Sequence, residues 1–139
     1  MEVSNPVQLA KGWAGTTTLD WSKPLSEDVL TLAKEVELVV ACDCVWLRSM
    51  LDSLLATVES IFASTTCSSP TLLLSFQRRD NQTGTDTGMF TTVRGVIDAI
   101  EARRWRMECL AWRNVAMDGV ETDKEVFVLA VRIREPGGV

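Results

Sequence analysis

Two short apolar runs, separated by a long amphipathic segment, constrain the fold of this chain more than any other feature. Residues 38–42 (LVVAC) and 71–76 (TLLLSF) each have the length of a strand and are almost entirely apolar. Continuous apolar runs are typical of parallel strands buried on both faces, whereas half-exposed strands alternate apolar and polar residues. We therefore expect two buried parallel strands joined by a right-handed crossover.

The segment between the two runs predicts a helix of about four turns. Its apolar residues recur at intervals of three and four, so they fall on one helical face. A stripe of this width is typical of a helix that packs against a sheet. The stripe consists of Leu47, Met50, Leu51, Leu54, Leu55, Val58, Ile61 and Phe62.

The N-terminal part predicts three shorter elements. An asparagine cap followed by proline, with a glycine after the last turn, indicates a short helix over residues 5–11. The β-branched stretch 15–19 indicates a strand. A serine cap opens a helix over residues 26–34, with Leu30 and Ala33 on its apolar face.

The C-terminal part predicts a helix and two strands. Residues 77–88 form a polar loop that is either a lid or a connection without a function of its own. After it, apolar periodicity indicates a helix over residues 90–104. Residues 107–112 and 125–134 read as strands, and Asp118-Gly119 marks the turn between them. We expect an antiparallel hairpin at the margin of the sheet.

This order of elements predicts one α/β domain over residues 1–139 with helices on both faces of the sheet. In such sheets ligands bind beyond the carboxyl ends of the strands. Three predicted strands end in polar or aromatic residues, which are therefore candidate site residues. Each of them could instead have a purely structural role, as a helix cap, a packing residue or a solvated charge. They are Asp20, Trp21, Asp43, Trp46, Phe76, Arg78 and Arg79.

Composition excludes several classes of function. Lys plus Arg is 14 and Asp plus Glu is 19, so the net charge of −5 argues against a nucleic-acid-binding protein. The chain contains no His and no Tyr, which removes imidazole bases and phenolic acids, and we expect no metal site. The four cysteines form no CxxC pair and are expected to be buried and inert. Without a leader or a membrane-length apolar run, the sequence predicts an intracellular, cytoplasmic protein with no membrane partner.

Four segments together resemble a known family. They are LDW at 19–21, VVACDCVW at 39–46, the Leu-rich helix and LLLSFQRR at 72–79. In this order they are similar to the C-terminal part of class I, seven-β-strand, S-adenosylmethionine-dependent methyltransferases, specifically the methyltransferase-like protein lysine methyltransferases. The resemblance implies a Rossmann-like sheet that closes with an antiparallel β-hairpin, S-adenosylmethionine as cofactor, and a protein substrate with a target lysine.

The resemblance also implies roles for the candidate residues. Asp20 and Trp21 match the segment that lies beside the adenosine portion of the cofactor. Asp43 and Trp46 match a D-x-x-Y segment that shapes the cofactor and target-lysine pocket, so both are candidate catalytic residues and Asp43 also a cofactor-binding residue. Trp46 stands in the tyrosine position, and an indole donates a hydrogen bond but does not accept one. Phe76, Arg78 and Arg79 are the candidates for substrate binding.

The family's glycine-rich cofactor loop and the acidic residue after its second strand have no counterpart in this sequence. We therefore expect an N-terminally truncated sheet that lacks the first two βα units, on the order of 60 residues. Such a sheet exposes a long apolar edge. Our first interpretation is that the chain is a lysine methyltransferase domain that has weak or no catalytic activity on its own. The alternatives are a non-catalytic interaction module or gene fragment, which pairs with a partner or a second copy through that edge, and a small-molecule methyltransferase.

Overall fold

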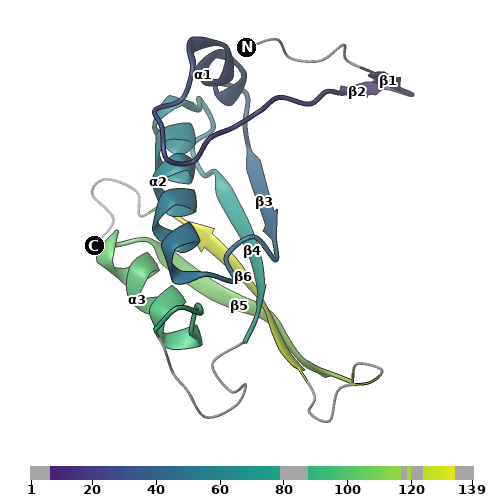
Figure 1. The fold of residues 1–139 in the computed structure, drawn as a ribbon. Helices are drawn as coiled ribbons and strands as arrows, with labels where there is room; N and C mark the ends of the chain where they lie inside the picture. Colours follow the sequence, from purple (N-terminus) through teal and green to yellow (C-terminus); the bar gives the residue numbers. More distant parts are fainter. Residues whose placement is uncertain (1–6, 79–87, 117–118, 120–123, 134–139) are drawn as a thin grey trace.

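The computed structural model describes residues 7–78, 88–116, 119 and 124–133, which form a mixed α/β fold (Figure 1). Two short strands come first, and a four-stranded sheet with three helices follows. In chain order the elements are β1 (Val7–Leu9), β2 (Gly12–Ala14), α1 (Glu27–Ala33), β3 (Leu38–Cys42), α2 (Arg48–Ser64), β4 (Thr71–Gln77), α3 (Val93–Ala102), β5 (Arg106–Val115) and β6 (Lys124–Arg132).

The four-stranded sheet has the order β3-β4-β6-β5. β3 and β4 are parallel, with Leu38 opposite Thr71 and Cys42 opposite Ser75, and α2 connects them. β6 lies antiparallel to both β4 and β5. The predicted strand-helix-strand unit is therefore confirmed, and the last two strands pair with each other as expected.

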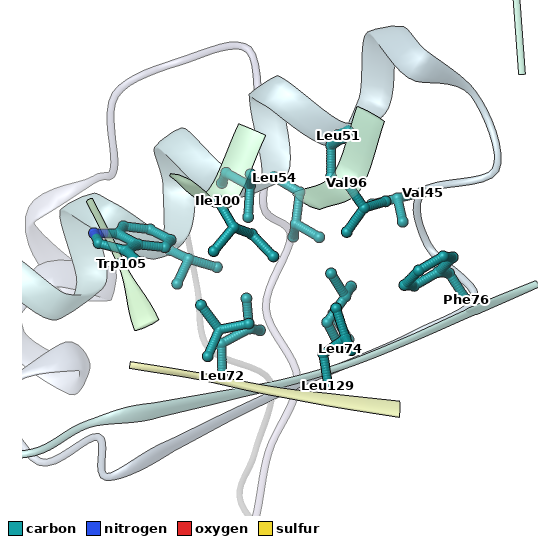
Figure 2. Close-up of a cluster of buried hydrophobic side chains, with 14 of the residues drawn as sticks. Val45, Leu51, Leu54, Leu72, Leu74, Phe76, Val96, Ile100, Trp105 and Leu129 are labelled. Atoms are coloured by element: carbon teal, nitrogen blue, oxygen red, sulfur yellow. The ribbon is translucent and has the colours of Figure 1, made fainter. Parts of the chain in front are cut away.

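The hydrophobic core lies between one face of this sheet and the helices α2 and α3 (Figure 2). On β4 every second residue is buried, because successive side chains point to opposite faces of a strand. Leu55 and Val58 of α2 and Ile100 of α3 are fully buried against that face. The Leu-rich stripe is thus confirmed as a core face. The buried β4 residues are Leu72, Leu74 and Phe76, and Leu129 and Val131 are their neighbours on β6.

The opposite face of the sheet carries no helix among the described residues, which corrects two expectations. β3 is not buried on both faces: the side chains of Leu38 and Val40 are 51% and 57% exposed, and only Ala41 is buried. Helices likewise cover one face rather than two in the described chain (Figure 1). An apolar run records a preference for burial, but burial also requires an element that covers the strand.

Two of the three N-terminal expectations, the helix over residues 5–11 and the strand over residues 15–19, are also wrong where the structure describes them. Residues 7–14 form an antiparallel hairpin rather than a helix, with a two-residue turn whose Ala10 has φ 47°. A helix of that length leaves most of its backbone groups unpaired, whereas the hairpin pairs them across the strands. Residues 15–19 have no regular structure. β-branched residues favour a strand only where a neighbouring strand is present to pair with it.

The remaining helices begin close to the predicted positions. The Ser26 side chain accepts a hydrogen bond from the Val29 N–H and caps α1, where Val29 is buried with Ala33 while Leu30 is half-buried. Thr92 caps α3, so Phe90 precedes this helix and instead bridges to Leu47. The predicted burial of the cysteines is wrong: Cys42 and Cys109 are exposed, and Cys44 and Cys67 are half-buried. None of the described helices is long and apolar enough to cross a membrane.

Candidate functional site

The loop that follows β3 is fixed to the end of β4. Asp43 has φ 50°, a left-handed conformation that Asp tolerates better than most residues with a side chain. Its N–H donates a hydrogen bond of 2.9 Å to the carbonyl oxygen of Ser75. The backbone therefore turns sharply at the carboxyl end of β3, and the Asp43 residue is left exposed at the surface. Such an unusual backbone conformation, held by its neighbours, is a common feature of functional sites.

A second segment, residues 89–92, holds the rest of this loop. The Thr91 N–H donates to the Trp46 carbonyl oxygen at 3.0 Å, and the Arg48 N–H donates to the Met89 carbonyl oxygen at 3.0 Å. Between these bonds, Leu47 and Phe90 form an isolated antiparallel bridge. Trp46, which is 41% exposed, therefore projects from a backbone that is tied on both sides. The structure thus brings Asp43 and Trp46 together on one short, constrained loop.

The candidate substrate-binding residues at the end of β4 differ from one another. Phe76 is 3% exposed and stacks on Phe127, with ring centroids 5.4 Å apart, so its ring packs in the core beneath this edge. Arg78 forms an ion pair of 2.7 Å with Glu125, and its N–H donates to the Glu125 carbonyl oxygen. Arg78 therefore ties the end of β4 to the start of β6. Arg79 lies outside the described residues.

The segment that carries Asp20 and Trp21 lies elsewhere. Figure 1 shows the chain between β2 and α1 passing beside α1 and the C-terminal half of α2, whereas the loop from β3 enters the opposite end of α2. Asp20 accepts hydrogen bonds from the backbone and hydroxyl of Ser22, at 2.9 and 2.6 Å, and lies 3.6 Å from the Lys23 ammonium. Trp21 packs against the core cluster. The structure therefore does not bring this pair to Asp43 and Trp46.

The same contacts set the charge of Asp20. The pKa of its carboxyl group is lowered from the usual value, chiefly by the hydrogen bond from the Ser22 hydroxyl, then by the Ser22 N–H and by the nearby Lys23. Each of these interactions favours the ionised form. In its carboxylate form, Asp20 thus stabilises the turn that contains Ser22 and Lys23.

Sequence reasoning missed a cavity beside Arg78. It has a volume of about 410 Å³ and lies between α3 and the strands β5 and β6. Trp112 and Arg94 contribute to its wall together with Arg78, Glu125 and Phe127. Trp112 is 34 positions from Arg78 in the chain, so only the pairing of β4, β6 and β5 reveals their proximity. The sequence hints at this wall only by placing a tryptophan in a predicted strand, and the structure shows that this Trp112 is 48% exposed.

Comparison with known proteins gives one decisive result. A family model described as lysine methyltransferase matches residues 2–94, which is more than half of the chain. The chain belongs to the lysine methyltransferase family. Searches of the curated proteins and of the solved structures give no significant match.

The matched range of this lysine methyltransferase domain contains every candidate site residue. It begins before β1 and ends in the first turn of α3, so it includes Asp20, Asp43 and Arg78 but neither β5 nor β6. The resemblance of the four sequence segments is thereby confirmed at the level of the family. In the described part of the chain, no group of three or more His, Cys, Asp or Glu residues is arranged to hold a metal ion.

Proposed function

We propose that this chain is a protein lysine methyltransferase-type domain in which Asp43 and Trp46 border the target amine. The proposal rests above all on one observation: the family match covers a constrained, surface-facing Asp43 at the carboxyl end of a parallel strand. That edge is where α/β sheets place their ligands. A lysine side chain of a protein substrate is the group that a lysine methyltransferase modifies.

Asp43 suits an amine by its charge and its fixed position. A neutral amine that accepts a methyl group becomes positively charged at nitrogen, so a nearby carboxylate stabilises the developing charge and accepts hydrogen bonds from the amine. The left-handed backbone and the hydrogen bond to Ser75 hold Asp43 in place without help from a ligand. Such preorganisation matters because alignment supplies much of the rate in a displacement reaction.

Trp46 provides an aromatic wall three residues further along the same loop. An indole face attracts a cationic or partly cationic amine, an interaction worth about 0.5–1 kcal/mol at an exposed site. The indole N–H only donates, so Trp46 cannot accept a hydrogen bond from the amine as a phenol would. We infer that this residue binds the lysine side chain but orients it less well than tyrosine.

The described residues fit only part of a cofactor site. Lysine methyltransferases use S-adenosylmethionine, which supplies an activated methyl group. Asp20 is engaged by Ser22 and Lys23, and its segment lies away from the Asp43–Trp46 loop. Among the described residues, the candidate cofactor-binding segment therefore does not lie beside the proposed amine site. We infer that this chain by itself binds cofactor weakly and has weak or no catalytic activity.

A lysine peptide tests the proposed amine site without any cofactor. We expect a lysine-containing peptide to shift the Trp46 indole and Asp43 amide signals in a nitrogen–proton NMR spectrum, because both groups border the amine. The Asp43→Asn variant, which keeps the shape and removes the charge, should weaken binding about fivefold. The Trp46→Tyr variant should strengthen it about threefold, since a phenol accepts as well as donates.

The matched control is the same peptide with norleucine in place of lysine. It retains most of the apolar side chain but lacks the amine, so it should leave both signals unchanged. Equal shifts from the two peptides, or an Asp43→Asn variant that binds like the wild type, would refute the role of Asp43 at the amine.

A second candidate function, self-association, is favoured by the exposure of β3. Its only strand neighbour among the described residues is β4, so the other edge of β3 offers unpaired backbone groups. Leu38 and Val40 add an apolar surface beside that edge. An edge of this kind pairs readily with an extended strand of another molecule. We infer that a second copy of the chain occupies it.

Light scattering after size-exclusion chromatography tests this pairing. We expect the chain to dimerise at a concentration of roughly 100 μM and Val40→Lys to give a monomer, because a charged edge residue disfavours pairing. Leu110→Lys is the control, since Leu110 is similarly exposed but lies on β5, at the opposite edge of the sheet from β3. A wild-type chain that stays monomeric at this concentration, or equal effects of both variants, would exclude pairing through β3.

A further inference from the structure

A smaller cavity lies between the first turns of α2 and α3. Its volume is about 180 Å³, and Arg48, Asp52, Thr91 and Gly95 are among the residues that line it. It is separate from the cavity beside Arg78, with which it shares no residue. Arg48 follows the Asp43–Trp46 loop by two residues, so this cavity adjoins the proposed amine site.

The positive ends of two helices meet at this cavity. A helix N-terminus carries a partial positive charge and usually has acidic residues in its first turn. Neither α2 nor α3 has one there, and α2 has no side-chain cap. Instead α2 begins with Arg48, a cation at the end of the helix that disfavours cations. Among the described residues its guanidinium forms no ion pair, and an anion would complement its charge.

Thr91 gives an independent indication of a ligand. It is 3% exposed, and its hydroxyl has no hydrogen-bond partner among the described residues. A buried hydroxyl without a partner is destabilising and calls for an explanation. The neighbouring Thr92 is different, because its hydroxyl oxygen accepts the Gly95 N–H at 2.9 Å and so caps α3. The Thr91 hydroxyl is therefore the donor that a bound anion would satisfy.

Gly95 and Asp52 define the size and charge of the ligand. A Cβ atom at position 95 would lie 3.0 Å from the Thr92 hydroxyl oxygen, so glycine preserves the cap and keeps this wall of the cavity open. Asp52 lines the same cavity one helical turn after Arg48 and brings a negative charge. That charge opposes a dianion such as phosphate more than a singly charged carboxylate. A carboxylate is thus the oxyanion that fits best.

We propose that this cavity is an oxyanion site that receives the carboxylate of a Glu or Asp side chain near the target lysine of the protein substrate. Arg48 supplies the charge, the Thr91 hydroxyl donates a hydrogen bond, and the first turn of α3 adds its partial positive charge. The assignment to a substrate rests on the proposed function, whereas the oxyanion site itself does not. It gives the domain a preference for lysines in an acidic sequence context.

A pair of peptides without lysine tests the site on the full chain. One contains a single glutamate, the other glutamine at the same position, and binding is followed through the amide signals of Gly95 and Arg94 by NMR. The glutamate peptide should shift these signals and the glutamine peptide should not. Arg48→Gln should weaken binding about tenfold, because it removes a charge-assisted hydrogen bond. Asp52→Asn should strengthen binding about threefold by removing the opposing charge.

Thr91→Val separates a binding role from a merely structural one. It replaces the hydroxyl by a methyl group of similar size, so the free chain should melt about 3 °C higher while the glutamate peptide binds about fivefold more weakly. Equal binding of the two peptides, or unchanged binding in both Arg48→Gln and Thr91→Val, overturns the proposal. If the glutamate peptide binds as stated but lysine peptides leave Trp46 unaffected, the oxyanion site stands and its assignment to a methyltransferase substrate is overturned.

Discussion

Replacing Leu74 by alanine is expected to lower the free energy of unfolding by about 3 kcal/mol. Leu74 is fully buried on β4, where the core faces α2 and α3, and Leu129 lies opposite it on β6 (Figure 2). The substitution removes three carbon atoms from the closely packed layer between sheet and helices. It therefore loses the transfer free energy of those atoms and leaves a cavity that the neighbours fill only in part.

Chemical denaturation followed by circular dichroism measures this loss. Leu110→Ala is the matched control, because it deletes the same atoms from a side chain that is 52% exposed on β5. Its expected effect is below about 1 kcal/mol. Equal destabilisation by the two variants would show that the β4 face is not the packed side of the sheet. The thermal midpoint of Leu74→Ala should fall by about 10 °C.

The central part of the fold could be predicted from the sequence because its signals are long or repeated. The α2 stripe continues over more than four turns, and the apolar runs of β3 and β4 each match one strand. Ser26 marks the start of α1 because a capping hydroxyl acts locally, on a backbone N–H three residues later. Such features depend little on the rest of the molecule.

The errors arise where structure depends on distant neighbours. Residues 15–19 have β-branched side chains but no adjacent strand among the described residues, so no sheet forms there. Leu38 and Val40 belong to an apolar run, yet no described element covers them. The short proline-led segment before Gly12 contains a cap signal but too few residues for a stable helix. Local pattern does not reveal the presence or absence of a partner.

The candidate site could be predicted only in part for the same reason. Asp43 is visible in the sequence as the polar residue that ends an apolar run, but its left-handed backbone is set by the bond to Ser75. Arg48 and Thr91 are 43 positions apart, and only the backbone pairing between the two loops places them on one cavity. The segment that carries Asp20 and Trp21 follows a different path from the loop after β3 (Figure 1), and the strand-end pattern does not encode that path.

The strongest functional expectation concerns the cofactor. A catalytically competent lysine methyltransferase must hold S-adenosylmethionine and the amine in line, so groups for both must lie at one edge of the sheet. Here the amine candidates Asp43 and Trp46 lie on one loop, while Asp20 is occupied by Ser22 in a segment that passes beside α1 and the C-terminal half of α2 (Figure 1). The described residues thus offer the proposed surroundings of the amine but do not bring a group for the cofactor beside them.

Calorimetric titration of the full chain with S-adenosylhomocysteine tests this account most directly. We expect no saturable heat up to about 1 mM ligand, which corresponds to a binding free energy weaker than about −4 kcal/mol. Circular dichroism on the same sample, and the NMR response to the lysine peptide, establish that the chain is folded and its amine site intact. A dissociation constant in the micromolar range that is lost in Trp21→Ala would contradict the account, because it would place a complete cofactor site in these 139 residues.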